Sequence, residues 1–180
     1  MDADFTIRDA TPDDYEAVAA LTVAAYRALP TWVGDDYALE LADVAGRAAL
    51  GATVLVAEDG AGRLLGAVTL VLPPSPLFEW ACDVDGDCGF RMLAVDPGAQ
   101  GRGVGPALVE ECLRRSRAAG RTRMIIGSTP WMNTAHRIYE RMGFARRPDL
   151  DQQWGWITGW AFVLDLAEYP SGPGMGKERP

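Results

Sequence analysis

The chain has 180 residues, of which 48% are hydrophobic and 23% are charged, and this composition is typical of a soluble globular protein. The net charge of −8 argues against nucleic acid as the main partner, because binding a phosphate backbone requires clustered Lys and Arg. No apolar run approaches the roughly 18 residues of a membrane-spanning helix, and the opening Met1-Asp2-Ala3-Asp4 is acidic where a secretory leader is basic. We therefore predict a cytoplasmic protein without a membrane partner.

A short strand and two helices are predicted at the start of the chain. Residues 5–8 alternate between apolar and polar side chains, as a strand does. Thr11 is a predicted helix N-cap, with Pro12 at the first helical position and Asp14 three residues after the cap. Residues 35–50 are predicted to form one continuous second helix.

A β-hairpin is predicted next, from strands at residues 53–57 and 64–72 that are joined by a glycine-containing turn. Prolines then end this pattern and begin a loop of about 15 residues. The remaining predicted elements follow in chain order: a strand at 90–95, a helix at 104–118, a strand at 124–127, a helix at 132–142, and strands at 144–147 and 160–164.

The most informative segment is the glycine-rich turn Gln100-Gly101-Arg102-Gly103-Val104-Gly105, which joins an apolar strand to a helix. The first N–H groups of a helix lack intrahelical partners and lie at the positive end of its dipole, and glycines let phosphate oxygens approach them closely. We expect a phosphate to be held by the N–H groups of Gly101, Gly103, Val104 and Gly105. The charge of Arg102 is available at the rim, whereas Pro106 has no N–H and removes one donor.

Two nucleotide-binding motifs fail on spacing. A Walker A loop requires a lysine at the position where Val104 follows Gly103. A dinucleotide fingerprint requires an acidic residue about 20 positions further on, where this chain reads Arg121-Thr122-Arg123. The spacing that does fit is Gln-x-x-Gly-x-Gly, preceded by the run Leu-Ala-Val-Asp-Pro.

With this spacing, residues 90–120 resemble the acyl-coenzyme A binding segment of the GNAT superfamily of N-acetyltransferases. The resemblance implies acetyl-CoA as cosubstrate, with its pyrophosphate on the turn from Gln100 to Gly105. It also implies that the preceding strand, through Leu93, Ala94 and Val95, offers main-chain groups to the pantetheine arm and the thioester.

The predicted element order matches the GNAT arrangement over nearly the whole chain. The resemblance implies an α/β (α+β) fold with a mixed, mostly antiparallel sheet that is flanked by helices and has splayed central strands. We expect a single domain over residues 1–168 and a disordered, Pro- and Gly-rich tail over residues 169–180.

A second motif, residues 131–144, resembles the family's segment in which an asparagine precedes Tyr-x-x-x-Gly-Phe. The resemblance implies that Asn133 bonds the pantetheine arm and that Tyr139 is the general acid that protonates the leaving thiolate. Tyrosine titrates near ~10 and a thiol near ~8.5, so this transfer is uphill by roughly 2 kcal/mol in water and needs a poorly solvated site. The alternative is that Tyr139 is an ordinary core aromatic.

The base that deprotonates the amine is harder to assign. Many GNAT relatives carry a glutamate on the strand before the thioester, but residues 88–92 contain no carboxylate. The candidates lie just upstream, with Asp87 and Glu79 ranked first: Glu79, Asp83, Asp85 and Asp87. A substrate of low pKa, such as a protein N-terminus or an arylamine, needs less help. His136 is expected on another part of the Tyr139 helix face or on an exposed flank.

No metal site is predicted. The chain has three widely spaced cysteines and a single histidine, and it contains no C-x-x-C pair, so a structural zinc site is not expected. The cysteines are Cys82, Cys88 and Cys112. Residues 83–87 resemble the opening of a calcium loop, but Cys88 stands where that loop needs glycine and Ala94 where it needs glutamate. We therefore predict reduced, buried thiols.

We predict an N-acetyltransferase that moves an acetyl group from acetyl-CoA to an amine by direct attack in a ternary complex, because no nucleophile motif supports an acyl-enzyme. One alternative is a GNAT-fold domain that binds coenzyme A as a sensor or structural element, and another is a generic nucleotide-phosphate binder. The sequence does not decide which small-molecule or peptide amine is the acceptor, whether the protein forms a homodimer, or whether acyl groups other than acetyl are used. The tryptophans that could line an acceptor pocket are Trp32, Trp80, Trp131, Trp154 and Trp156.

Overall fold

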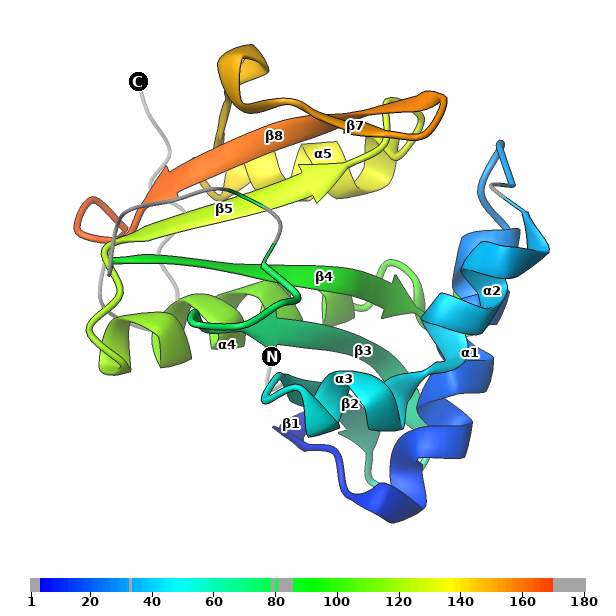
Figure 1. Cartoon of the computed structure of the whole chain (residues 1–180). Coiled ribbons are helices and arrows are strands. Elements are labelled where there is room, and N and C mark those ends of the chain that lie inside the picture. The colour runs from blue at the N-terminus through cyan, green and yellow to red at the C-terminus, as the bar shows by residue number, and fades with distance from the viewer. Residues whose placement is uncertain (1–3, 33, 79, 81–85, 170–180) are drawn as a thin grey trace.

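The computed structural model of the chain describes residues 4–32, 34–78, 80 and 86–169 (Figure 1). Its strands are β1 (Phe5–Asp9), β2 (Thr53–Asp59), β3 (Leu64–Val71), β4 (Asp87–Val95), β5 (Arg123–Ser128), β6 (Ala145–Arg146), β7 (Gln152–Trp154) and β8 (Ile157–Asp165). Its α-helices are α1 (Tyr15–Arg27), α2 (Asp35–Ala42), α3 (Val44–Ala49), α4 (Val104–Ala118) and α5 (Asn133–Arg141).

The strands form one sheet in the order β1-β2-β3-β4-β5-β8-β6, and β7 pairs with β8 as a short hairpin partner. The β4–β5 pair is parallel, and the other described pairs are antiparallel. Helices cover both faces of the sheet (Figure 1). The predicted mixed, mostly antiparallel sheet with flanking helices is confirmed.

The two central strands separate soon after they meet. Their parallel ladder contains only Asp87 opposite Arg123 and Cys88 opposite Met124. Beyond this end, β4 stays with β3 and β5 stays with β8, so the sheet divides into two halves (Figure 1). The predicted splay of the central strands is therefore confirmed, and it leaves main-chain groups of both strands outside their shared ladder.

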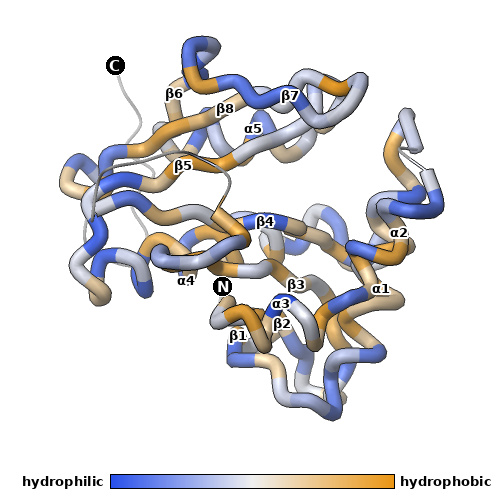
Figure 2. The backbone as a smooth tube through the Cα atoms, viewed as in Figure 1, coloured by the Kyte–Doolittle hydropathy of each residue, from blue (hydrophilic) through white to orange (hydrophobic). Residues whose placement is uncertain are grey.

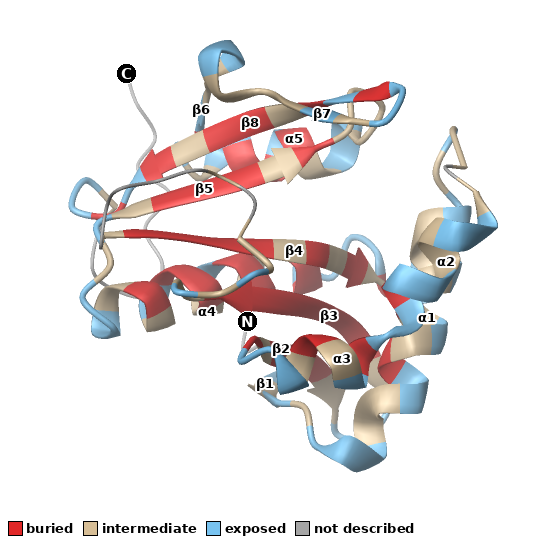
Figure 3. Cartoon of the chain, viewed as in Figure 1, coloured by how far each residue is buried: buried red, intermediate tan, exposed pale blue. Residues whose placement is uncertain are grey.

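Alternation along β2 builds a core on each face of the sheet. Val54 and Val56 pack with Val18 of α1 and Val44 of α3, whereas the alternating Leu55 belongs to the larger core under α4 and α5. Figure 2 shows the apolar run of β3. Figure 3 shows that the central strands are largely buried, whereas the helices have exposed faces. Each fully buried aliphatic side chain stabilises the fold by about 1.5–3 kcal/mol.

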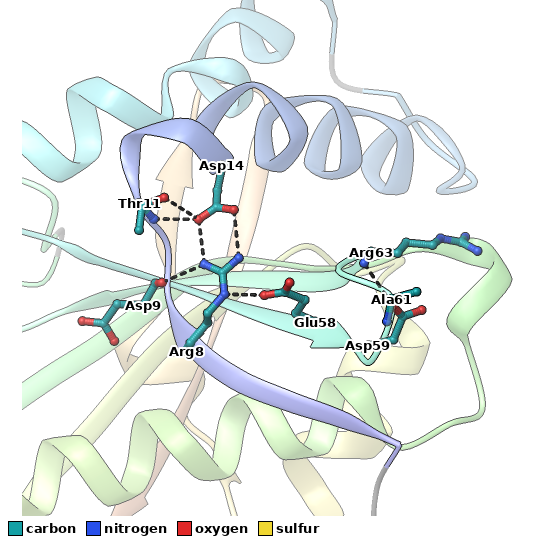
Figure 4. A network of polar contacts seen from close by, with 8 residues as sticks. All are labelled: Arg8, Asp9, Thr11, Asp14, Glu58, Asp59, Ala61 and Arg63. Atoms are coloured by element: carbon teal, nitrogen blue, oxygen red, sulfur yellow. Dashed lines mark hydrogen bonds and ion pairs between the residues drawn. The ribbon is translucent and has the colours of Figure 1, made fainter.

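Polar contacts join β1, β2 and the start of α1 (Figure 4). The N–H of Thr11 donates to the Asp14 carboxylate at 2.7 Å, and Arg8 donates to both oxygens of that carboxylate at 2.7 and 2.9 Å. Arg8 is also ion-paired with Glu58. The predicted start at Thr11 and Pro12 therefore holds, with a 3-10 turn at Pro12–Asp14 that leads into α1.

The continuous helix predicted over residues 35–50 is wrong. Asp43 interrupts it with φ −78° and ψ 65°, and its carboxylate accepts the Gly46 N–H at 2.9 Å as the N-cap of α3. Aspartate offers the main chain this alternative to an intrahelical hydrogen bond, so the chain bends between α2 and α3. Strand β7 is a further element that the sequence pattern missed.

Cys88 and Cys112 are free and buried, as predicted, and burial raises the pKa of the Cys88 thiol to about 11. Other predictions lie outside the described residues: the roles of Cys82, Glu79, Asp83 and Asp85, and the disorder of residues 170–180. Among the helices that the structure describes, none is both long and apolar enough to cross a membrane.

Candidate active site

A bulge in β4 lies where the two halves of the sheet part. The β3–β4 ladder passes from Thr69 opposite Arg91 to Ala67 opposite Ala94, so β4 carries one extra residue. Met92 takes a left-handed conformation there, with φ 55°. Neither the β3 ladder nor the β5 ladder includes Met92 or Leu93 among the described pairs, and such bulges often free main-chain groups next to functional sites.

The glycine turn follows β4 after Asp96 and a short 3-10 turn at Pro97–Ala99. Gly101 and Gly103 have φ values of 80° and 82°, which glycine adopts without the steric cost of a side chain. Gln100, Gly101, Arg102 and Gly103 are exposed, whereas Val104 and Gly105 are buried at the first turn of α4. The free amides at this helix start therefore lie next to the exposed glycines Gly101 and Gly103, which have no side chain to block a ligand.

Arg102 was expected to offer an available charge at the rim of this turn, but in the structure it is ion-paired. Its guanidinium donates to the Asp4 carboxylate at 2.6 Å, across an exposed ion pair. Solvent screens exposed ion pairs of this kind and makes them weak, so an anionic ligand can compete for the arginine. Pro106 is the third residue of α4, where its missing N–H removes a donor without breaking the helix.

A cavity of about 270 Å³ lies beside the separated parts of β4 and β5. Its wall includes Gly89 to Met92 of β4, Gly127 and Ser128 of β5, and residues of α1 and α2. Most of the other lining groups are aromatic or aliphatic: Tyr26, Leu29, Tyr37, Val71, Leu77, Phe78, Trp80, Trp131, Met132, Trp154 and Ile157. The bulge at Met92 is thus part of the wall of an apolar cavity.

Three of the predicted tryptophans, Trp80, Trp131 and Trp154, line this cavity. Gly127 of β5 makes room for the Trp154 ring, since a Cβ at that position would lie 2.6 Å from the ring. Trp156 stacks on Trp131 with ring centroids 6.1 Å apart, although it is not itself a lining residue. Trp32 also lies outside the lining, below Arg27 on the α1 side.

Among the lining residues that the structure describes, the charged ones are Arg91 and Glu40. Arg91 donates to the Glu40 carboxylate at 2.8 Å, and both residues line the cavity. Behind them, the buried Arg47 donates to the Thr69 hydroxyl at 3.2 Å and to the Glu40 carbonyl at 2.7 Å. Burial lowers the pKa of Arg47 and raises that of Tyr26 well above 10.

Tyr139 lies on the inner face of α5 and is 3% exposed. Its ring packs against Phe90 of β4, Phe144 and Phe162, with centroids 5.6–5.9 Å away. Burial raises the pKa of its phenol far above the usual 10, so the hydroxyl keeps its proton at neutral pH. Phe90 joins Tyr139 to the cavity, because that ring also lines the wall.

The structure separates the other predicted site residues. Asp87 is fully buried, lies outside the cavity lining and accepts two hydrogen bonds from Arg123 at 2.7 and 2.8 Å. Asn133 is exposed at the first position of α5, and Glu79 lies outside the described residues. Leu93, Ala94 and Val95 form the end of β4, between the bulge and the segment that leads to the glycine turn.

One pair of polar residues was missed by the sequence reasoning. His136 is buried rather than exposed, and its Nε2 lies 3.1 Å from the Ser128 hydroxyl oxygen at the end of β5. The available signal was weak: a serine at a strand end and a histidine one helical turn before Tyr139. Their contact depends on how α5 packs under β5, which no local pattern specifies.

Comparison with known proteins identifies the family. Residues 15–144 match the sequence profile of the Acetyltransferase (GNAT) family. The chain belongs to this family. Members of this family use acetyl-CoA as cosubstrate.

Individual relatives agree with this placement. The chain is 37% identical over 90 residues to a mycothiol acetyltransferase of Beutenbergia cavernae, a match that spans 50% of this chain and only 27% of that protein. A GNAT acetyltransferase structure from Staphylococcus aureus superposes with a TM-score of 0.71 at 12% identity, over 90% of this chain and 99% of the other.

YncA of Salmonella typhimurium, solved with its cofactor acetyl-CoA, gives a TM-score of 0.65 at 24% identity over 95% and 98% of the two chains. At these identities the two structural matches support the fold.

Proposed function

We propose that this GNAT-family protein is an N-acetyltransferase that transfers the acetyl group of acetyl-CoA to an amine held in the apolar cavity. The observation that carries the proposal is the path of the chain at β4. This strand passes from the cavity wall at Gly89–Met92 through the bulge to Val95, and a 3-10 turn at Pro97–Ala99 then leads to the exposed glycine turn. A carrier lying along this strand with its pyrophosphate on the turn would present its thioester to the cavity.

The residues present fit such a carrier. The proposed donors, at the positive end of the α4 dipole, are the amides of Gly101, Gly103, Val104 and Gly105. A Cβ at Gly101 or Gly103 would meet no atom within 4 Å, so the space above them is open. Main-chain groups at Met92 and Leu93 lie outside the described ladders and can bond the pantetheine amides and the thioester oxygen.

Tyr139 is the proposed acid for the leaving thiolate. Its phenol stays protonated because it is buried, and the same apolar surroundings destabilise a thiolate, which raises the thiol pKa and narrows the unfavourable gap between the two groups. In this proposal the amine attacks the thioester carbonyl directly, the C–S bond breaks, and the sulfur takes the phenolic proton. The phenolate then recovers a proton from the new amide nitrogen.

The acceptor is an amine attached to an apolar or aromatic body of small size. Support comes from the lining of the cavity, in which aromatic and aliphatic side chains predominate, and from its volume of about 270 Å³. Aromatic faces also attract a cationic amine, by about 0.5–2 kcal/mol. The single described carboxylate in the lining, Glu40, is ion-paired with Arg91, so this pair adds no net charge to the wall.

A thiol-release assay over a panel of amines tests the proposal. With acetyl-CoA, 2-phenylethylamine and tryptamine should release thiol faster than spermidine or an aminoglycoside, and the N-acetyl product should appear in equal amount. Calorimetric titration with acetyl-CoA, ATP and NAD runs beside it. Binding of acetyl-CoA without thiol release on any amine would favour the sensor alternative, and tighter binding of ATP or NAD would favour a nucleotide-phosphate binder.

A further inference from the structure

His136 stands in an unusual environment for a residue without a function. It is 7% exposed, on the same helix as Tyr139 and one turn before it, and its ring stacks on Trp160 at 5.5 Å and contacts Phe162 at 5.0 Å. Apolar packing alone would not require imidazole. Its Nε2 has a polar partner, the hydroxyl of Ser128, at 3.1 Å.

Ser128 connects this buried ring to the cavity. It is the last residue of β5, it lines the cavity wall, and it is 3% exposed. Among the described lining residues, Glu40 is the only carboxylate, and it is already paired with Arg91. Ser128 is therefore a lining residue of the cavity whose hydroxyl contacts a titratable nitrogen.

The groups around the ring favour its neutral form. Burial is the largest influence and lowers the pKa of His136 below 6.5. The Thr129 main chain and Glu140 of α5 act in the opposite direction, while Arg146 of β6 lowers the pKa further. Arg146 is itself held by Asp151 at 2.6 and 2.7 Å and lies over the Trp160 ring. A neutral imidazole has one nitrogen with a free lone pair.

We propose that Ser128 is a catalytic residue and that His136 acts through it, as a two-residue relay that takes the proton from the acceptor ammonium. This inference rests on the proposed N-acetyl transfer. The ammonium N–H passes its proton to the Ser128 oxygen, the Ser128 hydroxyl proton moves to His136 Nε2, and the neutral amine then attacks the thioester. The imidazolium returns this proton to solvent through Ser128 when product leaves, so the net reaction releases one proton.

The relay requires a specific tautomer. His136 Nε2 can accept the serine proton only if Nδ1 carries the hydrogen, because in the other tautomer Nε2 is a donor. The chain contains a single histidine, so a protein free of any histidine tag gives one set of imidazole signals. We expect ¹⁵N NMR at pH 7.5 to show a neutral ring protonated on Nδ1. A ring protonated on Nε2, or a charged ring, would overturn the proposal.

Kinetics provide the second readout, with 2-phenylethylamine and acetyl-CoA. Ser128→Ala and His136→Gln should each lower kcat/KM by about 100-fold or more, the usual size of a general-base contribution. In the wild type, kcat/KM should fall as the pH drops through the His136 pKa, and this acid limb should vanish in His136→Gln. Ser128→Thr keeps the hydroxyl and should recover activity to within about tenfold of wild type.

Ser116→Ala is the matched control, because it removes a buried serine hydroxyl on α4 that does not line the cavity. Its kcat/KM should be unchanged. If the wild type acetylates no amine, the proposed function itself fails. If the wild type is active while Ser128→Ala and His136→Gln keep the wild-type rate and pH profile, the relay alone is wrong.

Discussion

At the scale of single residues, burial and one or two partners decide which groups can exchange protons. Tyr139 is buried among Phe90, Phe144 and Phe162, and this burial keeps its phenol protonated, as the proposed acid role requires. Asp14, at the opposite end of the molecule, is held in its ionised form by Arg8. We therefore predict that a substitution at Tyr139 changes activity and that one at Asp14 changes stability.

Tyr139→Phe removes the proposed acid and little else. The phenyl ring preserves the three aromatic contacts, so the variant should fold with nearly the wild-type Tm. Its kcat should fall by about 100-fold or more, the scale of a general-acid contribution, while the Kd for acetyl-CoA changes little. Steady-state kinetics and calorimetry check this together. A variant with wild-type kcat would show that another group protonates the thiolate.

Asp14→Asn should alter the acid side of the stability curve. Hydrogen bonds from Arg8 hold the pKa of Asp14 below its ordinary 3.8, so this carboxylate stabilises the fold above about pH 4 and the contribution is lost as the pH falls further. The variant should lose about 1 kcal/mol at pH 7 and show a weaker dependence on pH below 4. Urea unfolding at pH 3 and pH 7 measures both effects.

The same substitution at the exposed neighbour Asp13 is the control for that experiment, since Asp13→Asn changes the charge of the same turn by the same amount. Equal losses in the two variants at pH 7 would mean that net charge, not the Arg8 contact, is responsible.

At the scale of elements, local sequence predicted what local interactions determine. The end of β4 at Val95, the glycine turn and the helix over residues 104–118 were predicted at their observed positions, because apolar periodicity and positive-φ glycines act over a few residues. The strand itself begins at Asp87, earlier than the predicted residue 90. The break at Asp43 was missed because its carboxylate competes with a helical pattern that continues on both sides. The bulge at Met92 depends on the register with β3, which the β4 sequence alone does not encode.

In the candidate site too, the features set by local sequence were predicted and those set by tertiary packing were missed. Sequence indicated the glycine turn and the Tyr139 helix, but it ranked Asp87 as a base because of its nearness along the chain. In the fold, Asp87 faces Arg123 on the neighbouring strand and lies outside the cavity lining. The Ser128–His136 contact was missed for the complementary reason, since it joins two elements through tertiary packing.

The glycine turn can be tested with a matched pair of substitutions. Gly103 and Gly120 have φ values of 82° and 74° and open space around their Cβ positions, but Gly120 follows the far end of α4. Gly103→Glu and Gly120→Glu should each lose about 1–2 kcal/mol of stability from left-handed strain. Only Gly103→Glu should weaken acetyl-CoA binding, by roughly 100-fold, because it sets like charges together.

Titration calorimetry on folded samples of both variants gives the answer. Unchanged affinity in Gly103→Glu would mean that the pyrophosphate is held elsewhere.

At the scale of the whole molecule, two half-sheets meet at one end and separate at the other. The closed end holds the short β4–β5 ladder and the Asp87–Arg123 ion pair, and the open end holds the cavity, the bulge and Ser128. This division places stabilising contacts apart from the groups proposed to act on substrates. From this arrangement we predict that substitutions at the closed end lower the free energy of unfolding but leave the catalytic rate nearly unchanged.

Asp87→Asn tests that separation. Because Asp87 is fully buried and Arg123 is partly exposed, the loss should be about 2–3 kcal/mol, below the usual range for a fully buried pair. Activity at temperatures where the variant remains folded should stay within about threefold of wild type, far less than the loss of a general base. The exposed pair Arg147–Asp149 is the control, and Asp149→Asn should leave the free energy of unfolding nearly unchanged. A selective loss of kcat in Asp87→Asn would restore it as a base.

A rapid-quench, single-turnover experiment tests the central claim most directly. Protein in excess is mixed with acetyl-CoA, with and without 2-phenylethylamine, and coenzyme A, N-acetyl product and intact protein mass are followed together. We predict that coenzyme A and N-acetylamine form at the same rate, that neither forms without amine, and that the protein mass never increases. Thiol release without amine, an acetylated protein intermediate, or no N-acetyl product from a protein that binds acetyl-CoA would contradict direct acetyl transfer to an amine.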